Sequence, residues 1–262
     1  MPELPDVSVF RDYFDKTTLK KKIERVEVFE KRILKGTSEK ELNKALKGKF
    51  FKKSDRYGKH LFAEIDPEAG LDIHFGMTGD LELIDDISKI PPYTRLLFIF
   101  QDGGGLAFED QRKFGHISLV HDFDDLISQN DLGKDALSIT AEEFLEIIHK
   151  RKGKIKSILM NQSLISGIGN VYADEILFQA GIHPGAKGSR IPDDKIMKLF
   201  STMNKVLKTA IKYDAKREDF PTKFLINYRR ENKDCPDSCG KINVIKINGR
   251  TTYFCGACQE LY

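Results

Sequence analysis

The spacing of apolar residues changes near residue 132 of this 262-residue chain, and this change limits the possible folds more than any other feature. From about Ile23 to residue 132, short apolar runs alternate with Gly, Asp and Pro turns at intervals of roughly ten residues, which is typical of an antiparallel β-sandwich or barrel. Beyond that point apolar residues recur at helical spacing, most clearly between residues 193 and 212. The sequence therefore predicts an α+β chain, with a β domain first and a helical domain second.

The first residues, Met1 to Asp6, combine an amine with a carboxylate. Initiator methionine is normally removed when a small residue follows, which leaves the secondary amine of Pro2 at the start of the mature chain. An α-amino group has a pKa of about 8, far below the ~10.4 of a lysine side chain, so part of it is unprotonated at neutral pH. Amines attack carbonyl carbons to give Schiff bases, and Glu3 is the adjacent candidate for proton transfer. The alternative is that the chain begins Met-Pro for no catalytic reason, as many proteins do.

Net charge does not identify a partner, because 43 basic residues face 40 acidic ones and the net charge is only +3. Any surface for nucleic acid must therefore be a local cluster, and residues 150–156 form one with five Lys or Arg in seven positions. This run leads into a helix connection that contains Gly167 and Gly169, and Asn170 is expected to cap the helix that follows. A helix N-terminus beside a glycine turn is a phosphate site. The alternatives are a solvated charged face and an ordinary helical hairpin.

Three turns of the β domain carry unusual residues. Lys59 lies between two predicted strands, and Met77 lies in a turn with a glycine on each side. A third turn holds Arg112 close to Phe114. An exposed Met can wedge into a base stack, and a cation beside an aromatic ring suits phosphates and bases. Taken singly, each residue also has an ordinary explanation, such as a lysine that keeps a turn soluble.

All four cysteines lie near the C-terminus, as Cys235-x3-Cys239 and Cys255-x2-Cys258. In a reducing compartment such a cluster favours metal over disulfides, and four thiolates fit one tetrahedral Zn²⁺. A module this short also needs a metal because it cannot bury an adequate core. Between the pairs, Asn248-Gly249 is a strong hairpin signal. The sequence therefore predicts one structural zinc ion held by a β-hairpin.

No run of 18 apolar residues occurs, and the N-terminus lacks the apolar region of a signal peptide. These features favour an intracellular, cytoplasmic protein without a membrane partner.

Together these features resemble the formamidopyrimidine-DNA glycosylase and endonuclease VIII family of base-excision repair enzymes. The resemblance runs over nearly the whole chain, and its strength is that five motifs occur in the right order. They are Pro-Glu-Leu-Pro, His-Phe-Gly-Met-Thr-Gly, Asp-Gln-Arg-Lys-Phe-Gly, Gly-Ile-Gly-Asn-Val-Tyr-Ala-Asp-Glu, and Gly-Arg-Thr-Thr before Cys-Gly-Ala-Cys-Gln. The resemblance implies a β-sandwich domain over residues 1–132 with an N-terminal helix, a helix-two-turn-helix domain over 133–228, and a zinc finger over 229–262.

The family pattern implies a role for each matching residue. Pro2 would be the Schiff-base nucleophile and Glu3 the proton donor and acceptor, while Lys59 would assist catalysis and Arg250 would bind the lesion phosphates and act in δ-elimination. The DNA-contacting residues would be Met77, Arg112, Phe114, Arg151, Lys156 and Asn170. The zinc ligands would be Cys235, Cys239, Cys255 and Cys258.

The implied function is a bifunctional DNA glycosylase and abasic-site lyase that removes oxidised bases from double-stranded DNA by β,δ-elimination. It would act as a nucleoid-associated monomer. The alternative is a non-catalytic binder of damaged or structured nucleic acid, but such a binder has no use for the pair Pro2 and Glu3. A sequence-specific regulator is weaker still, because nothing resembles a recognition helix for base edges.

The sequence departs from the family pattern in a few places. The first cysteine pair is separated by three residues where two are usual, so we expect a bulge there. Tyr93-Thr94-Arg95 replaces a frequent His-containing triplet, Gln111 replaces a frequent Pro, and Lys113 a frequent Arg. The segment 216–228 is short for the loop that closes over 8-oxoguanine, which predicts a slight preference for oxidised pyrimidines over 8-oxoguanine and formamidopyrimidine.

Overall fold

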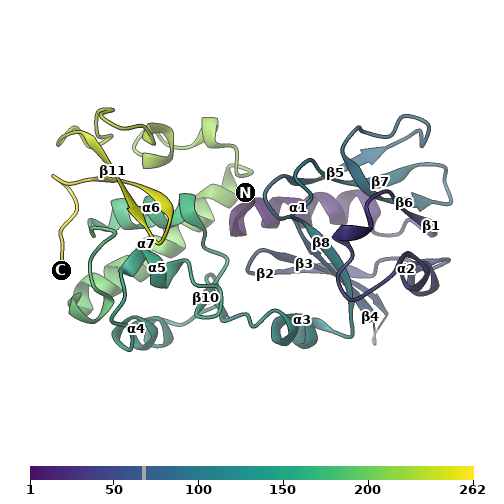
Figure 1. Ribbon diagram of the computed structural model, residues 1–262, viewed down its shortest axis with the longest axis horizontal. Helices are drawn as coiled ribbons and strands as arrows, with labels where there is room; N and C mark the ends of the chain where they lie inside the picture. The colour runs from purple at the N-terminus through teal and green to yellow at the C-terminus, as the bar shows by residue number, and fades with distance from the viewer. Residues whose placement is uncertain (67–68) are drawn as a thin grey trace. The chain divides into compact units, whose positions relative to one another are not determined.

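The computed structural model describes residues 1–66 and 69–262, and the chain divides into two compact units. The N-terminal unit comprises Met1–Pro2 and Asp6–Asn130, and the C-terminal unit comprises Glu3–Pro5 and Asp131–Tyr262. Figure 1 shows strands gathered in the first unit and mostly helices in the second. The α+β class with a β-rich first part and a helical second part is confirmed.

The N-terminal unit consists of two four-stranded antiparallel sheets. The first has the order β1-β6-β7-β5 and the second the order β2-β3-β4-β8. The strands are β1 (Ile23–Val28), β2 (Lys53–Tyr57), β3 (His60–Asp66), β4 (Ala69–His74), β5 (Gly79–Ile84), β6 (Thr94–Phe100), β7 (Gly105–Asp110) and β8 (His116–Val120). Four helical segments accompany them, namely α1 (Leu4–Thr18), η1 (Lys31–Ile33), α2 (Glu39–Leu46) and α3 (Phe123–Gln129).

One apolar core holds these two sheets together with helix α1. Phe14 of α1 is fully buried and its ring lies 4.9 Å from that of Phe51, which in turn lies 5.7 Å from Phe98 of β6. In the second sheet, Leu61 and Ile73 point into the same core. Because side chains alternate along a strand, their neighbours occupy the outer face of that sheet.

The C-terminal unit is built from helices and ends in a hairpin. Its helices are α4 (Ala141–His149), α5 (Ile155–Leu159), α6 (Asn170–Ala180) and α7 (Asp193–Lys212), with short 3-10 segments η2 (Gly188–Arg190), η3 (Arg217–Asp219) and η4 (Leu225–Tyr228). A short parallel pair is formed by β9 (Lys134–Asp135) and β10 (Ile165–Ser166). Thr140 and Glu143 form the capping box at the start of α4, and this reciprocal pairing satisfies backbone donors that the helix itself cannot.

The terminal hairpin pairs β11 (Ile242–Ile247) with β12 (Arg250–Cys255). Asn248 and Gly249 form its turn, with φ of 46° and 74°. Two consecutive positive φ values are what a tight type I′ turn requires, so the hairpin predicted from Asn-Gly is present.

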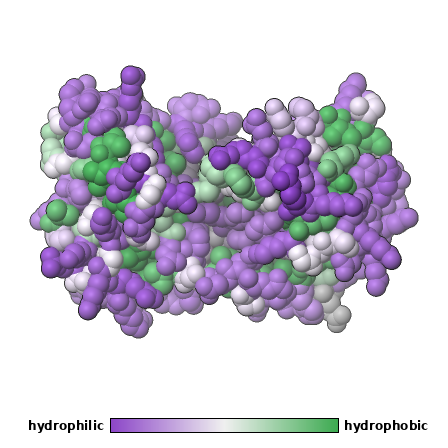
Figure 2. Space-filling view, viewed as in Figure 1, coloured by the Kyte–Doolittle hydropathy of each residue, from purple (hydrophilic) through white to green (hydrophobic). Residues whose placement is uncertain are grey.

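Within residues 1–66 and 69–262, no helix has the length and apolarity needed to cross a membrane. On the face drawn in Figure 2, hydrophobic residues appear as patches among hydrophilic ones.

Candidate functional site

Glu3 caps helix α6 of the C-terminal unit, although 166 residues of chain separate it from Gly169. Its carboxylate accepts hydrogen bonds from the backbone N–H groups of Gly169 at 2.7 Å, Val171 at 2.8 Å and Tyr172 at 3.2 Å. The side chain is buried, and the first turn of α6 contains no acidic residue of its own. A carboxylate is favoured here because it satisfies unpaired N–H donors at the positive end of the helix dipole. The cap therefore fixes the residue that follows Pro2.

Two glycines make room for this N-terminal segment. A Cβ on Gly169 would lie 2.3 Å from the carboxyl carbon of Glu3, and one on Gly167 would lie 2.6 Å from Cδ1 of Leu4. Gly167 also has a φ of +107°, and its carbonyl accepts a hydrogen bond from the Leu4 N–H at 3.0 Å. The close approach expected at these glycines is therefore made by the chain's own N-terminal residues.

The expectation that Asn170 caps α6 is wrong. Asn170 is the first residue of the helix, and its side-chain amide donates instead to the Thr251 carbonyl at 3.1 Å. The amides expected to receive a phosphate at this helix start are those that bind Glu3. Because each N–H group has one proton to donate, a phosphate that used these three amides would have to displace the carboxylate.

The location of Lys156 also differs from the prediction, which was a basic side chain at the surface. Its side chain is fully buried, and its ammonium group lies 2.7 Å from Asp174 Oδ1 and donates to Thr252 Oγ1 at 2.7 Å. The second Asp174 oxygen binds Arg229 at 2.5 Å and accepts the Tyr253 N–H at 3.1 Å. We call Lys156, Asp174 and Arg229 the Asp174 cluster. Burial lowers the pKa of Lys156 and raises that of Asp174, and their mutual attraction opposes both shifts.

The Asp174 cluster and its neighbours hold the terminal hairpin on α5 and α6. Thr252 and Tyr253 of β12 bind the cluster, and Asn248 in the hairpin turn donates to Ser157 Oγ of α5 at 3.0 Å. Arg250 is exposed at the start of β12, between these attached residues. Because the backbone is held on both sides of Arg250, mainly its side chain is free to move, which is compatible with the phosphate-binding role predicted for it.

In the N-terminal unit, Asp110 organises the turns that carry Met77, Arg112 and Phe114. The buried Asp110 carboxylate accepts from Thr78 Oγ1 at 2.5 Å, the Arg112 N–H at 3.2 Å and the Gly115 N–H at 2.6 Å. It thereby ties the turn after β4 to the turn after β7.

These two turns touch at the backbone level. Gly76 has a φ of +57°, and a Cβ there would lie 2.4 Å from the Gly115 nitrogen. Phe114 is 56% exposed, and the Arg112 guanidinium lies 5.1 Å from the centre of its ring. Met77 is half-buried rather than exposed. The structure therefore brings Met77, Arg112 and Phe114 together on two connected turns.

Lys59 belongs to the N-terminal unit and Arg151 to the C-terminal unit. Lys59 is half-buried in the two-residue turn that joins β2 to β3, where Tyr57 pairs with His60. Arg151 is exposed in the basic run and lines a shallow hollow of about 570 Å³ with Ser157 and Asn161. Pro2 is half-buried, and Met1 before it is 43% exposed.

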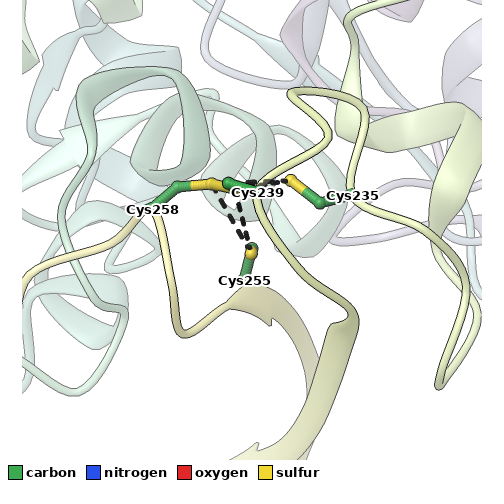
Figure 3. Close-up of side chains that lie close together, drawn as sticks. All are labelled: Cys235, Cys239, Cys255 and Cys258. Carbon is green, nitrogen blue, oxygen red and sulfur yellow. Dashed lines mark hydrogen bonds between the residues drawn. A yellow bond between two sulfur atoms is a disulfide. The ribbon is translucent and has the colours of Figure 1, made fainter.

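The four cysteines meet at one point between the loop before β11 and the end of β12 (Figure 3). Cys239 and Cys258 form a disulfide, and Cys235 and Cys255 are free. The sulfur of Cys235 lies 3.3 Å from that of Cys239, and that of Cys255 lies 3.5 Å from those of both Cys239 and Cys258. In a tetrahedral zinc site with Zn–S bonds of ~2.3 Å, sulfurs are about 3.8 Å apart. Once reduced, the four thiolates fit such an ion.

The additional residue between Cys235 and Cys239 is taken up by a tight turn. Ser238 adopts a φ of 56°, and its N–H donates to the Cys235 carbonyl at 2.8 Å. A left-handed conformation is uncommon outside glycine and marks the expected bulge.

Sequence reasoning did not single out Asp110 or Asp174 as organising residues. Both lay inside the motifs Asp-Gln-Arg-Lys-Phe-Gly and Ala-Asp-Glu. The available signal was the charge itself, since Asp174 and Glu175 are the charged residues of the mostly buried helix α6, and a buried charge needs partners.

The β-sandwich, the helix connection capped by Glu3 and the four-cysteine hairpin define the helix-two-turn-helix class of DNA glycosylases. Residues 1–117 match the family model of the formamidopyrimidine-DNA glycosylase N-terminal domain, and residues 132–221 match that of the formamidopyrimidine-DNA glycosylase H2TH domain. The chain belongs to the formamidopyrimidine-DNA glycosylase family.

Individual relatives match over nearly the whole chain. The formamidopyrimidine-DNA glycosylase of Solibacter usitatus is 35% identical over 271 residues, covering 99% of this chain and 100% of the relative. That of Arabidopsis thaliana is 32% identical over 279 residues, covering 100% of this chain and 72% of the relative.

Solved structures of the family show the same fold. The Lactococcus lactis Fpg complex with abasic-site DNA has a TM-score of 0.87 at 29% identity, with 98% of this chain and 99% of that chain covered. MutM in complex with DNA containing carbocyclic 8-oxo-G has a TM-score of 0.89 at 30% identity, covering 99% of this chain and 100% of that chain.

Proposed function

We propose that this chain excises oxidised bases from double-stranded DNA and then cleaves the strand at the abasic site. The observation that carries the proposal is the fixed carboxylate of Glu3, held by three amides of α6 and adjacent in sequence to the candidate nucleophile Pro2. The relatives support the substrate class, since they include an Fpg bound to abasic-site DNA and a MutM bound to DNA with an 8-oxo-G analogue.

In the proposed mechanism, removal of Met1 exposes the Pro2 amine, which attacks C1′ of the damaged nucleotide. A nitrogen–carbon bond forms, the glycosidic bond breaks, and the base leaves with its bonding electrons and takes up a proton. The proline nitrogen then loses its proton and the C1′–O4′ bond of the sugar breaks, with O4′ taking up a proton, to leave an iminium ion that makes the C2′ protons acidic. Loss of one expels the 3′ phosphate, and a second elimination expels the 5′ phosphate. Glu3 transfers protons in these steps, because its carboxylate is the nearest such group along the chain.

The remaining residues would hold and open the DNA. Lys59, Arg151 and Arg250 would bind backbone phosphates, which fixes register rather than sequence. The base must leave the stack to be reached, and Met77, Arg112 and Phe114 would fill the space it leaves.

The proposed role of Met77, Arg112 and Phe114 has the most direct structural support. One buried carboxylate, that of Asp110, holds both of the turns that carry these three residues.

Cys235, Cys239, Cys255 and Cys258 would hold one structural Zn²⁺. Four protein thiolates leave no open coordination position, so the ion would stabilise the hairpin that presents Arg250.

Borohydride trapping tests the proposal. Purified chain whose N-terminus is verified by mass spectrometry is mixed with abasic duplex and reductant, beside Pro2→Gly, Glu3→Gln and a form with an uncleaved N-terminal extension. We expect a covalent adduct that peptide mapping places on Pro2, and no adduct when the extension blocks the amine. If a chain that begins at Pro2 binds the duplex but never traps, the non-catalytic binder is the correct function.

A lesion panel tests the substrate preference. The short segment 216–228 predicts that thymine glycol and dihydrouracil are removed slightly faster than 8-oxoguanine, whereas the names of the relatives point to formamidopyrimidine. Single-turnover excision rates on matched duplexes rank the lesions, and faster removal of 8-oxoguanine would overturn the pyrimidine preference.

A further inference from the structure

Three histidines form a row across the second sheet of the N-terminal unit. His60 of β3 pairs with His74 of β4, and His74 pairs with His116 of β8. Asp72 lies two residues before His74 on the same strand and therefore on the same face. This face is the outer one, because Leu61 and Ile73, which point the other way, belong to the core.

Asp72 lies between two of these histidines and is completely buried. Its Oδ1 is 2.9 Å from His60 Nδ1, and its Oδ2 is 3.8 Å from His116 Nε2. Asn130, which follows α3, donates a hydrogen bond from its side-chain amide to Asp72 Oδ2 at 3.4 Å. The carboxylate therefore presents one oxygen toward each ring.

His116 Nε2 is the unusual atom of this cluster. It is buried, and it has no hydrogen-bond partner among the described residues, although it points toward a carboxylate. A buried polar atom without a partner is costly and calls for an explanation. A ligand between His116 and Asp72 would supply the missing interaction.

His74 does not share this arrangement, although its ring is stacked on that of His116 with the centres 4.8 Å apart. Its Nδ1 accepts a hydrogen bond from the Gly76 N–H at 3.2 Å. Only His60, Asp72 and His116 converge, and one ligand atom from each lies within 4.8 Å of the others.

We propose that His60, Asp72 and His116 form a second metal site, for a divalent transition-metal ion such as Zn²⁺, Co²⁺ or Ni²⁺. A set of two imidazoles and one carboxylate binds such transition-metal ions in preference to Mg²⁺ or Ca²⁺. With bonds of ~2.0–2.1 Å, tetrahedral ligand atoms are about 3.3 Å apart, between the two distances to Asp72 in the structure. An ion would be admitted if the first distance opened and the second closed by a few tenths of an ångström, and if the ligand atoms of the two histidines, which lie within 4.8 Å of each other, reached a similar separation.

The site is accessible and independent of the thiolate cluster. The His116 side chain is 22% exposed although its Nε2 is buried, so an ion would enter past the exposed part of this ring, and three protein ligands leave a coordination position for water. The ion would join β3, β4 and β8 at the ends from which two functional turns leave. Lys59 directly precedes His60, and Met77 lies three residues after His74.

Cobalt binding to the full chain tests the proposal. The thiolate cluster is first reduced and filled with zinc, and Co²⁺ is then titrated while visible absorption and metal content are measured. We expect a second ion per chain with weak visible bands and without the strong thiolate-to-cobalt charge-transfer bands of a cysteine site. In His60→Gln and His116→Gln, affinity for this ion should fall by about tenfold or more.

Two matched controls separate the site from general histidine binding. His121→Gln removes an exposed histidine of the same unit, and His74→Gln removes the stacked but non-ligating ring. Both should keep the second ion, and circular dichroism verifies that each variant is folded. Binding of one ion only by the wild-type chain, or a second ion that survives in His116→Gln, would overturn the assignment.

Discussion

Replacing Lys156 by methionine tests the buried ion pair most directly. Methionine keeps much of the length of the side chain but removes the ammonium group that lies 2.7 Å from Asp174 Oδ1. Because both side chains are fully buried, the substitution leaves a buried carboxylate with one cationic partner fewer. Removing one partner of a buried pair costs about 3–5 kcal/mol. We expect a value near ~3 kcal/mol, because Arg229 and the Tyr253 N–H still bind Asp174.

Urea unfolding followed by circular dichroism at a helix wavelength measures this cost. With a slope of ~1–3 kcal/mol/M, a loss of ~3 kcal/mol lowers the midpoint of the transition of the C-terminal helices by about 1–3 M. Lys154→Met is the matched control, since Lys154 is exposed two residues earlier and should change stability by less than about 0.5 kcal/mol. The double variant Lys156→Met/Asp174→Asn should lose less unfolding free energy than the sum of the losses of the two single variants. We expect this difference, the coupling free energy, to be about 1 kcal/mol or more.

A different outcome would refute the reasoning. If Lys156→Met unfolds at the wild-type urea concentration but binds abasic DNA more weakly, with a shallower salt dependence, then Lys156 contacts phosphate in solution. The loss of one phosphate contact lowers the salt slope by about 0.9. Stability and salt slope thus distinguish a buried structural lysine from a surface contact.

Three further predictions concern other buried groups. Gly169→Ala places a Cβ 2.3 Å from the Glu3 carboxyl carbon, so we expect Schiff-base trapping to slow strongly while zinc content is unchanged. Asp110→Asn cannot accept all of the hydrogen bonds that hold the two turns, and we expect a loss of about 1–3 kcal/mol in thermal unfolding together with weaker binding of abasic DNA. Burial raises the pKa of Glu175 from 4.5 to about 7, so its stabilising contribution is complete below pH 4.5 and is lost as the pH rises through 7. The unfolding free energy of the wild-type chain should therefore fall by up to about 3 kcal/mol over that window relative to Glu175→Gln, and equal pH profiles would contradict this.

Local signals in the sequence predicted local structure well. The Asn248-Gly249 turn, the Thr140–Glu143 capping box and the amphipathic pattern of α7 each depend on residues a few positions apart. The physical rules for such features involve only neighbouring backbone groups, so a sequence is sufficient to apply them.

The contacts that build the candidate site depend on residues far apart in the chain. Glu3 meets Gly169 across 166 residues, and Lys156 belongs to a charged run that gives no sign that its last member is buried. Likewise, His60 and His116 converge on Asp72 only because of the register between strands. Such convergence is a property of the tertiary fold, and periodicity in the sequence does not determine it.

The cap formed by Glu3 also sets an order of events during synthesis. Glu3 binds amides that are made 166 residues later in synthesis, so this contact cannot form until α6 has emerged. At about 5–20 residues per second, the delay is on the order of ten seconds or more. Throughout that interval Glu3 is not held by α6, and the proposed removal of Met1 would take place on a segment without this contact. In the proposed mechanism, Met1 would therefore be removed from Pro2 before the Glu3 cap forms.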